Sequence, residues 1–113
     1  ILDFAVVEQL GKYNKPALIR QVYEDFLQET ETVMAPIQKL LEEEDFEKII
    51  ASLHVIKGNS GTLGINKVYI QSLEAEKLAR KNDWKSVPPQ LEKLQNEIES
   101  FRKYLNEASI FEL

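Results

Sequence analysis

Hydrophobic residues recur every three to four positions along almost the whole chain, and no segment alternates convincingly with a period of two. The first spacing places apolar side chains on one face of a helix, whereas the second is typical of a half-buried strand. We find no internal repeat and no low-complexity tract. The pattern therefore predicts an all-α protein.

The spacing predicts one short helix followed by four longer ones. The short helix covers residues 2–10 and ends near Gly11, and the long helices are expected at residues 15–44, 46–63, 67–81 and 87–108. Short loops between long amphipathic helices favour antiparallel neighbours. We therefore expect residues 1–113 to form a single domain, an antiparallel up-down four-helix bundle with the short additional N-terminal helix lying across one end.

Polar residues precede each long helix, where their side chains would accept hydrogen bonds from free backbone N–H groups. These expected N-caps are Asn14, Asp45, Asn66 and Ser86. Gly64 is expected to end the helix that contains residues 46–63. Pro36 lies inside the first long helix and is expected to kink it, because its ring removes a backbone donor and crowds the preceding turn.

Each long helix carries a set of residues that the spacing assigns to the core. In chain order, these sets are Ile19, Val22, Phe26, Val33, Ile37, Leu40 and Leu41; Ile49, Leu53, Ile56, Ser60 and Leu63; Val68, Ser72, Ala75 and Ala79; and Leu91, Leu94, Ile98, Phe101, Leu105 and Ala108. We also expect Phe46 in the core and Trp84, which lies near a turn, at the end of the bundle.

Composition narrows the class of protein. Hydrophobic residues make up 43% and charged residues 29%, the balance of a soluble globular protein. The net charge of -5 argues against a nucleic-acid partner or an anionic membrane surface. Cysteine is absent, which excludes disulfides and thiolate metal sites. No apolar run approaches the roughly 20 residues of a membrane span, and we expect a cytoplasmic protein.

His54 is the only histidine in the chain. On a helix, Ile50, Lys57, Gly58 and Gly61 share its face. The core residues of this helix lie a quarter-turn or more away, so His54 should point at least partly outward. An exposed imidazole in its uncharged form is a good nucleophile near neutral pH.

The glycines around His54 need a reason, because a glycine inside a helix costs about 1 kcal/mol relative to alanine. A helical side chain leans toward the N-terminus, so a larger residue at position 58 would lean over His54. Gly58 leaves the imidazole open to an approaching protein. Lys57 supplies a positive charge suited to an anionic group beside the ring, and Asn59 and Ser60 add hydrogen-bond donors.

The stretch from His54 to Gly64, HVIKGNSGTLG, closely resembles the signature of histidine-containing phosphotransfer (HPt) domains: His, a hydrophobic residue, Lys, Gly, any residue, Ser, and then Leu-Gly. The similarity is strongest over these eleven residues and extends more weakly through the helix pattern over most of the chain. On the following helix, family members often have a small or thiol residue, then Leu or Ile, then Glu or Gln. Here Ser72 and Ala75-Glu76 fill those places, and Leu73-Glu74 is out of register.

The resemblance implies a four-helix bundle in which His54 accepts a phosphoryl group from the phospho-aspartate of a response-regulator receiver domain, or donates one to it. Lys57 and Ser60 would support the phosphohistidine, and Gly58 would permit close docking. Ile50 and Gly61 would join them in the partner-binding surface. The receiver would supply magnesium and the catalytic acidic residues, so this chain itself would hold no metal or cofactor and would not hydrolyse ATP.

Some of these residues have a second interpretation. Ser60 lies on the core face, so its hydroxyl either supports the phosphoryl group or bonds to its own backbone within a close helix contact. Gly61 and Gly64 are also explained by packing and by helix termination, and we favour termination for Gly64. Ile50 would belong to an apolar docking patch only if it is exposed.

Three functions remain open from the sequence. The first is a phosphocarrier in a two-component phosphorelay. The second is a helical adaptor that binds receivers or other partners without phosphorylation. The third is an enzyme, either a phosphohistidine phosphatase or the phosphotransfer part of a kinase; the sequence shows no nucleotide site, but the domain could belong to a larger hybrid sensor kinase. We expect a monomer, because an exposed acceptor face and a closed bundle need no partner subunit.

Overall fold

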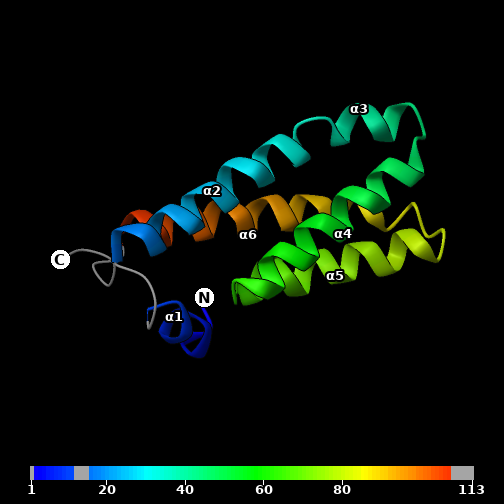
Figure 1. Cartoon of the computed structure of the whole chain (residues 1–113). Helices are drawn as coiled ribbons and strands as arrows, with labels where there is room; N and C mark the ends of the chain where they lie inside the picture. The colour runs from blue at the N-terminus through cyan, green and yellow to red at the C-terminus, as the bar shows by residue number, and fades with distance from the viewer. Residues whose placement is uncertain (1, 12–15, 108–113) are drawn as a thin grey trace.

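Six helices form the part of the chain that the structure, a computed structural model, describes, which is residues 2–11 and 16–107 (Figure 1). They are α1 (Phe4–Gly11), α2 (Pro16–Met34), α3 (Ile37–Glu42), α4 (Phe46–Thr62), α5 (Asn66–Arg80) and α6 (Val87–Glu107). Within these residues the only β-type pairing is an isolated bridge between Leu2 and Ile65. The prediction of an all-helical fold is confirmed.

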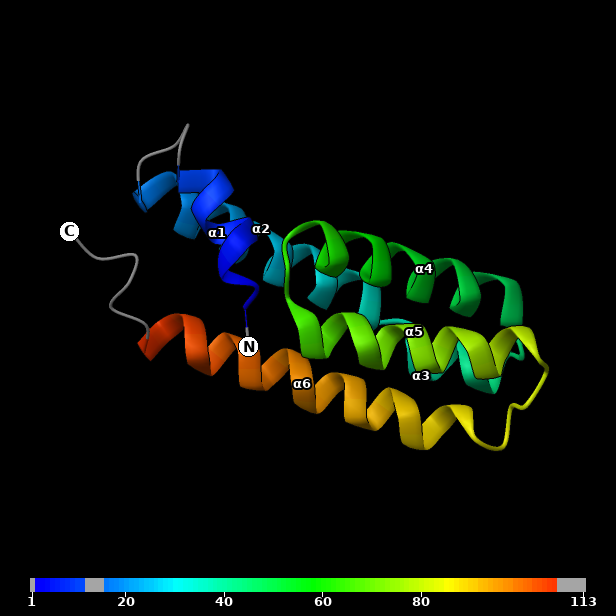
Figure 2. The same ribbon diagram turned by 90° about the horizontal axis from the view of Figure 1, so that it is seen from below.

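Consecutive long helices run in opposite directions. In Figure 1, α2 and α3 lead away from the N-terminal end, α4 returns, α5 leads away again and α6 returns. Figure 2 shows α4, α5 and α6 side by side, and α4 packs most extensively against α5. The described residues extend over 46 × 21 × 18 Å. This arrangement places the middle of α4 next to the middle of α5.

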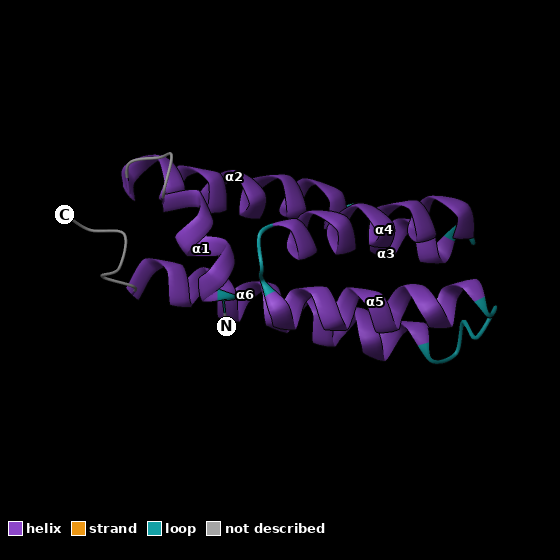
Figure 3. Ribbon diagram, turned by 60° about the horizontal axis from the view of Figure 1, so that its bottom comes forward, coloured by secondary structure: helices purple, strands orange, loops and turns teal. Residues whose placement is uncertain are grey.

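The short helix α1 lies across the end of the molecule at which α4 gives way to α5 (Figure 3). It begins at Phe4 rather than at Leu2, because the Asp3 carboxylate accepts a hydrogen bond of 3.0 Å from the Ala5 backbone and caps the helix. The Asp3 backbone N–H donates to the Gly64 carbonyl at 2.8 Å. The crosswise position is as the sequence predicts.

Gly64 ends α4 in the way that its position predicts. Its φ of +70° lies in the left-handed region, and the following turn carries the two hydrogen bonds of a Schellman motif, from Ile65 to Ser60 and from Gly64 to Gly61. A Cβ atom at this position would lie 2.8 Å from the Cβ of Asp3 and 3.1 Å from that of Val6. Glycine is therefore needed here both for the turn and for the close approach of α1.

Pro36 breaks the first long helix rather than kinking it. Helix α2 ends at Met34, Ala35 and Pro36 form a turn, and α3 begins at Ile37. The prediction of one continuous helix to residue 44 is therefore wrong. Proline donates no backbone hydrogen bond and crowds the preceding turn, which is enough to separate the two helices at this point.

Two of the predicted N-caps can be compared directly with the structure. The Asp45 side chain accepts a hydrogen bond from the Lys48 backbone at 3.4 Å, as predicted. The prediction for Asn66 is one residue off, because Ile65 is the N-cap of α5 and Asn66 is already helical. Ile65 is fully buried and pairs with Leu2, which fixes it at the helix start. Asn14 lies outside the described residues.

Most of the predicted core is buried as expected. The buried members of the predicted sets are Ile19, Phe26, Ile37, Ile49, Leu53, Ile56, Ser60, Val68, Ser72, Ala75, Ala79, Leu91, Leu94, Ile98, Phe101 and Leu105. Val33, Leu40, Leu41 and Leu63 are half-buried against them. Ala108 lies outside the described residues. At the end of the bundle away from α1, the rings of Phe46 and Trp84 stack with centroids 3.9 Å apart, and both pack against the core.

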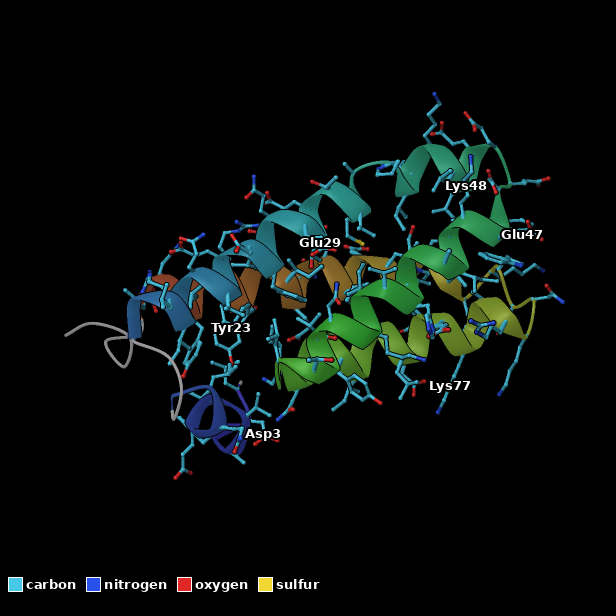
Figure 4. The ribbon with its side chains drawn as sticks, in the orientation of Figure 1. Asp3, Tyr23, Glu29, Glu47, Lys48 and Lys77 are labelled. Carbon is cyan, nitrogen blue, oxygen red and sulfur yellow. The ribbon has the colours of Figure 1, made fainter. Side chains whose placement is uncertain are left out.

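Val22 is the exception, because it is 37% exposed and the neighbouring Tyr23 is fully buried. The Tyr23 hydroxyl donates to the Leu63 carbonyl at 3.0 Å, which satisfies its polar group inside the core. Burial, followed by the nearby Asp3 and Tyr104, raises the pKa of Tyr23 to about 12. Figure 4 shows Tyr23 pointing from α2 toward the end at which α1 lies. The buried face of α2 is thus turned toward Tyr23, Leu27 and Thr30.

None of the helices in the described part of the chain combines the length and the apolar character that a membrane crossing requires.

Candidate functional site

His54 lies in the middle of α4 and points outward. Its side chain is 62% exposed, whereas Leu53 and Ile56 on the same helix are buried in the core. The outward direction predicted from the helical period is confirmed. This geometry makes the imidazole accessible to a molecule that approaches α4 from the solvent.

No side chain projects from α4 at Gly58, one turn after His54. A Cβ atom built at Gly58 meets nothing within 4 Å, so the position is open to solvent. Gly61 differs, because a Cβ atom there would lie 3.0 Å from Cδ1 of Tyr69 on α5. The ring of Tyr69 therefore packs against α4 at Gly61. The structure supports an open surface at Gly58 and helix packing at Gly61.

The buried carboxylate of Glu76 lies opposite His54, on α5. It is only 3% exposed. Its Oε2 lies 3.2 Å from Nδ1 of His54 and accepts hydrogen bonds from Nε and Nη2 of Arg80 at 2.8 and 2.7 Å. Its Oε1 lies 2.8 Å from Nζ of Lys57. One carboxylate thus joins α4 to α5 and gathers three basic side chains around it.

These neighbours keep Glu76 ionised. Burial alone would raise the pKa of its carboxyl group, but hydrogen bonds from Lys57, Arg80 and His54, together with the Lys57 charge, hold that pKa below its ordinary value. An ionised carboxylate can only accept hydrogen bonds. The proton of the neutral imidazole therefore lies on Nδ1, and Nε2 carries the free lone pair.

Positive charge is in excess beside the ring. Lys57 and Arg80 contribute two cations against the single carboxylate of Glu76. The Lys57 side chain is 23% exposed and that of Arg80 is 56% exposed, so both remain accessible in part. An anionic group bound at His54 would lie close to this charge.

Sequence reasoning gave Glu76 and Arg80 no role in the site. Glu76 appeared only as a residue filling a family position, and Arg80 was not among the predicted site residues. A signal was present, since Glu76 lies four residues after Ser72 and three before Ala79, next to the core face of α5. A carboxylate at such a position needs a cationic partner to be stable there.

Two other predicted site residues lie apart from this group. Ser60 is fully buried, and its hydroxyl donates to the carbonyl oxygens of Ile56 at 2.7 Å and Lys57 at 3.1 Å. Of its two interpretations, the structure favours packing and bonding to its own helix. Ile50 is half-buried against the core. The exposed apolar side chain next to His54 is instead Val55, which is 42% exposed.

No metal site emerges near these residues. Across residues 2–11 and 16–107, no three His, Cys, Asp or Glu side chains gather in a way that could hold a metal ion.

A comparison with protein families finds a match over most of the chain. The family model of the Hpt domain matches residues 21–104, which include His54, Lys57, Glu76 and Arg80. No curated protein and no solved structure matches the chain significantly.

Proposed function

Because this chain belongs to the Hpt domain family, whose members act in phosphotransfer of two-component signalling, we propose that it is a phosphorelay intermediate that carries a phosphoryl group on His54. The observation that supports this most directly is the contact of 3.2 Å between Nδ1 of His54 and the ionised carboxylate of Glu76. It leaves Nε2 as the nucleophilic nitrogen of an exposed ring. A histidine that only filled space on a helix surface would not need this arrangement.

The transfer step follows from this geometry. The Nε2 lone pair attacks the phosphorus of a receiver phospho-aspartate, the bond between phosphorus and the aspartate oxygen breaks, and the carboxylate leaves with the electron pair. Nδ1 keeps its proton, so the phosphorylated ring carries a positive charge that faces the Glu76 carboxylate. In the reverse step, a receiver carboxylate attacks the phosphorus and neutral imidazole leaves. Glu76 therefore stabilises the ring in both directions.

Lys57 and Arg80 have a second task in this proposal. The phosphoryl oxygens carry negative charge throughout the transfer, and nearby cations lower the energy of that charge. Gly58 would let the partner surface approach the ring closely, since no side chain projects there. We expect magnesium and the remaining catalytic carboxylates on the receiver domain. The chain itself would then work without a metal or a nucleotide.

The proposal takes the fold as an antiparallel four-helix bundle in which α2 and α3 together form the first long element. The alternating helix directions in Figure 1 support this. We further propose that the domain is a cytoplasmic monomer, acting alone or within a hybrid sensor kinase, with response-regulator receivers as partners. A stable dimer in sedimentation would contradict the monomer.

Phosphate labelling tests the function. The domain and its His54→Gln variant are incubated with a panel of phosphorylated receiver domains and, separately, with phosphoramidate, a small phosphoryl donor. We expect one acid-labile phosphoryl group by mass spectrometry on the unmodified domain, none on His54→Gln, and nearly equal melting temperatures, because the exposed imidazole contributes little to the core. Receivers that bind the folded domain without labelling it would favour a non-phosphorylated adaptor instead.

A further inference from the structure

A groove lies between α3 and the first turns of α6, at the end of the molecule away from α1 (Figure 1). Two hollows of about 550 and 380 Å³ join here, because both are lined by Gln38, Leu41 and Pro88. Apolar side chains form most of the remaining walls, and Met34 and Trp84 are among them. The groove is therefore a continuous and mainly apolar surface.

The break at Pro36 explains why this surface is open. Helix α2, before the break, packs against α6 as well as α4, whereas α3, after it, packs mainly against α4. The first turns of α6 therefore lack the cover that α2 gives to the later part of that helix. Pro88 and Pro89 in the first turn of α6 have short side chains, which fill little of the space toward α3.

The groove lies on the side of the bundle opposite His54. Around the bundle, α4 packs against α5, α5 against α6, and α6 against α2, which is continued by α3. His54 is exposed on the side where α4 meets α5, since its imidazole contacts Glu76 there. The groove lies where α3 faces α6. A molecule bound in the groove would thus leave the imidazole accessible to a receiver.

Carboxylates without ionic partners surround the groove. Glu42, Glu44 and Glu92 belong to its lining and are all exposed. Among the described residues, none of the three forms an ion pair, whereas the neighbouring Glu43 lies 3.7 Å from Nζ of Lys39. No lysine or arginine of the described chain lines either hollow. The charge around the apolar surface is therefore of one sign.

We propose that this groove binds an amphipathic helix of a partner protein, with apolar residues on one face and lysine or arginine at its edges. The groove lies between two antiparallel helices, and such a groove accepts the side-chain ridge of a third. The carboxylates complement basic residues at the edges of that helix. A second copy of this chain is a poorer occupant, because it would bring the same acids and a net charge of -5. The inference goes beyond the proposed function, since it does not involve the chemistry of His54.

Binding of synthetic helical peptides tests the inference. The first peptide has leucine on one face and lysine at its edges, the second has glutamate in place of lysine, and the third has alanine in place of leucine. Trp84 is the only tryptophan in the chain and lines the groove, so its fluorescence reports occupancy. We expect the first peptide to change this fluorescence and the backbone amide shifts of α3 and early α6. The other two should bind about tenfold more weakly or worse.

A double charge reversal, Glu42→Lys with Glu92→Lys, tests the role of the acids. We expect the reversed domain to bind the lysine peptide about tenfold more weakly at low salt and the glutamate peptide more tightly than the unmodified domain does. The control is Glu8→Lys with Glu74→Lys, which changes the net charge equally at exposed positions outside the groove. Lysine is a good helix former, so both double variants should fold.

Several results would overturn the inference. These are no binding of the lysine peptide, equal weakening in the control, or amide shifts centred on His54 instead of on α3 and α6. A dimer of the domain that buries the groove would overturn it as well, because a second copy would then be the occupant. Labelling of His54 by phosphoramidate should have the same rate with and without bound peptide, and a blocked imidazole would contradict the placement of the groove opposite His54.

Discussion

His54 lies between two unlike surfaces. Toward α5, the charges are paired and partly buried: Glu76 is 3% exposed and holds Lys57, Arg80 and the Nδ1 atom of His54. Toward α2, a groove of about 220 Å³ is lined by apolar and polar side chains, and the two carboxylates in its lining, Asp25 and Glu29, are exposed. The two surfaces therefore differ in the burial and in the pairing of their charges.

The two surfaces differ in how firmly their charged groups are held. A group that sets the tautomer of a reacting ring must be held in place, and burial with several hydrogen bonds does this. A charge without an oppositely charged partner must stay solvated, because a buried unpaired charge would be costly. We therefore expect changes on the α5 side to alter stability and chemistry together, and changes to the exposed carboxylates on the α2 side to leave stability nearly unchanged.

The largest effect is expected from Glu76→Ala. The change leaves Lys57 and Arg80 without their carboxylate, and we expect a free energy of unfolding lower by about 2 kcal/mol. The fixed tautomer is lost as well, so labelling of His54 by phosphoramidate should slow. Denaturant unfolding measures the first effect, and ¹⁵N chemical shifts of the imidazole report the second. Glu74→Ala, an exposed acid on the same helix, is the control and should change neither.

A smaller effect is expected from Gly58→Leu, which tests whether the open surface beside His54 serves docking. The leucine side chain would lean over the imidazole, and we expect transfer from a receiver to slow roughly tenfold or more with an intact fold. Gly58→Ala should raise the free energy of unfolding by about 0.5–1 kcal/mol, because the new Cβ meets open space and alanine favours helix. Gly61→Ala should not raise the free energy of unfolding in this way, because its Cβ would lie 3.0 Å from Cδ1 of Tyr69. An unchanged transfer rate for Gly58→Leu would contradict the docking role.

Features that depend on a few neighbouring residues were predictable from the sequence. The helices, the outward direction of His54 and the end of α4 at Gly64 all follow from local spacing and from the conformational range of glycine. The signature around His54 also led to the family before any comparison. The effect of Pro36 was less predictable. Proline can kink a helix or end it, and the outcome depends on how the neighbouring helices pack, which the local sequence does not specify.

Features that depend on how two helices meet were not predictable. Val22 and Tyr23 are adjacent in sequence, and the Leu63 carbonyl that accepts from the tyrosine hydroxyl lies 40 residues further along the chain. Glu76 is 22 residues from His54, and its contact requires the observed register of α4 against α5. Periodicity places each residue on a face of its own helix and leaves that register open. The sequence therefore predicted the histidine and the lysine of the site but not the role of their carboxylate.

Acid should reduce the contribution of Glu76 to the free energy of unfolding. The pKa of Glu76 is lowered in the folded state, so its contribution to stability is present above the ordinary carboxyl value of 4.5 and is lost as the pH falls through the lowered folded value. We expect the difference in unfolding free energy between the unmodified domain and Glu76→Gln to shrink below pH 4.5, because glutamine does not titrate. A difference that stayed constant with pH would show that the carboxylate charge contributes nothing.

The smallest effect is expected from Ser60→Ala, which decides between the two interpretations of that residue. Its hydroxyl donates only to the carbonyl oxygens of Ile56 and Lys57 on its own helix, which backbone N–H groups of the next turn can also satisfy. Loss of these bonds, offset by the better helix propensity of alanine, should change the unfolding free energy by about 1 kcal/mol or less. Transfer should keep its rate, since the hydroxyl is buried and bonds to its own helix. Slower transfer in a variant with unchanged melting would mean that the hydroxyl turns toward the phosphoryl group during the reaction, and the chemistry would then extend from the α5 side of His54 into the core of α4.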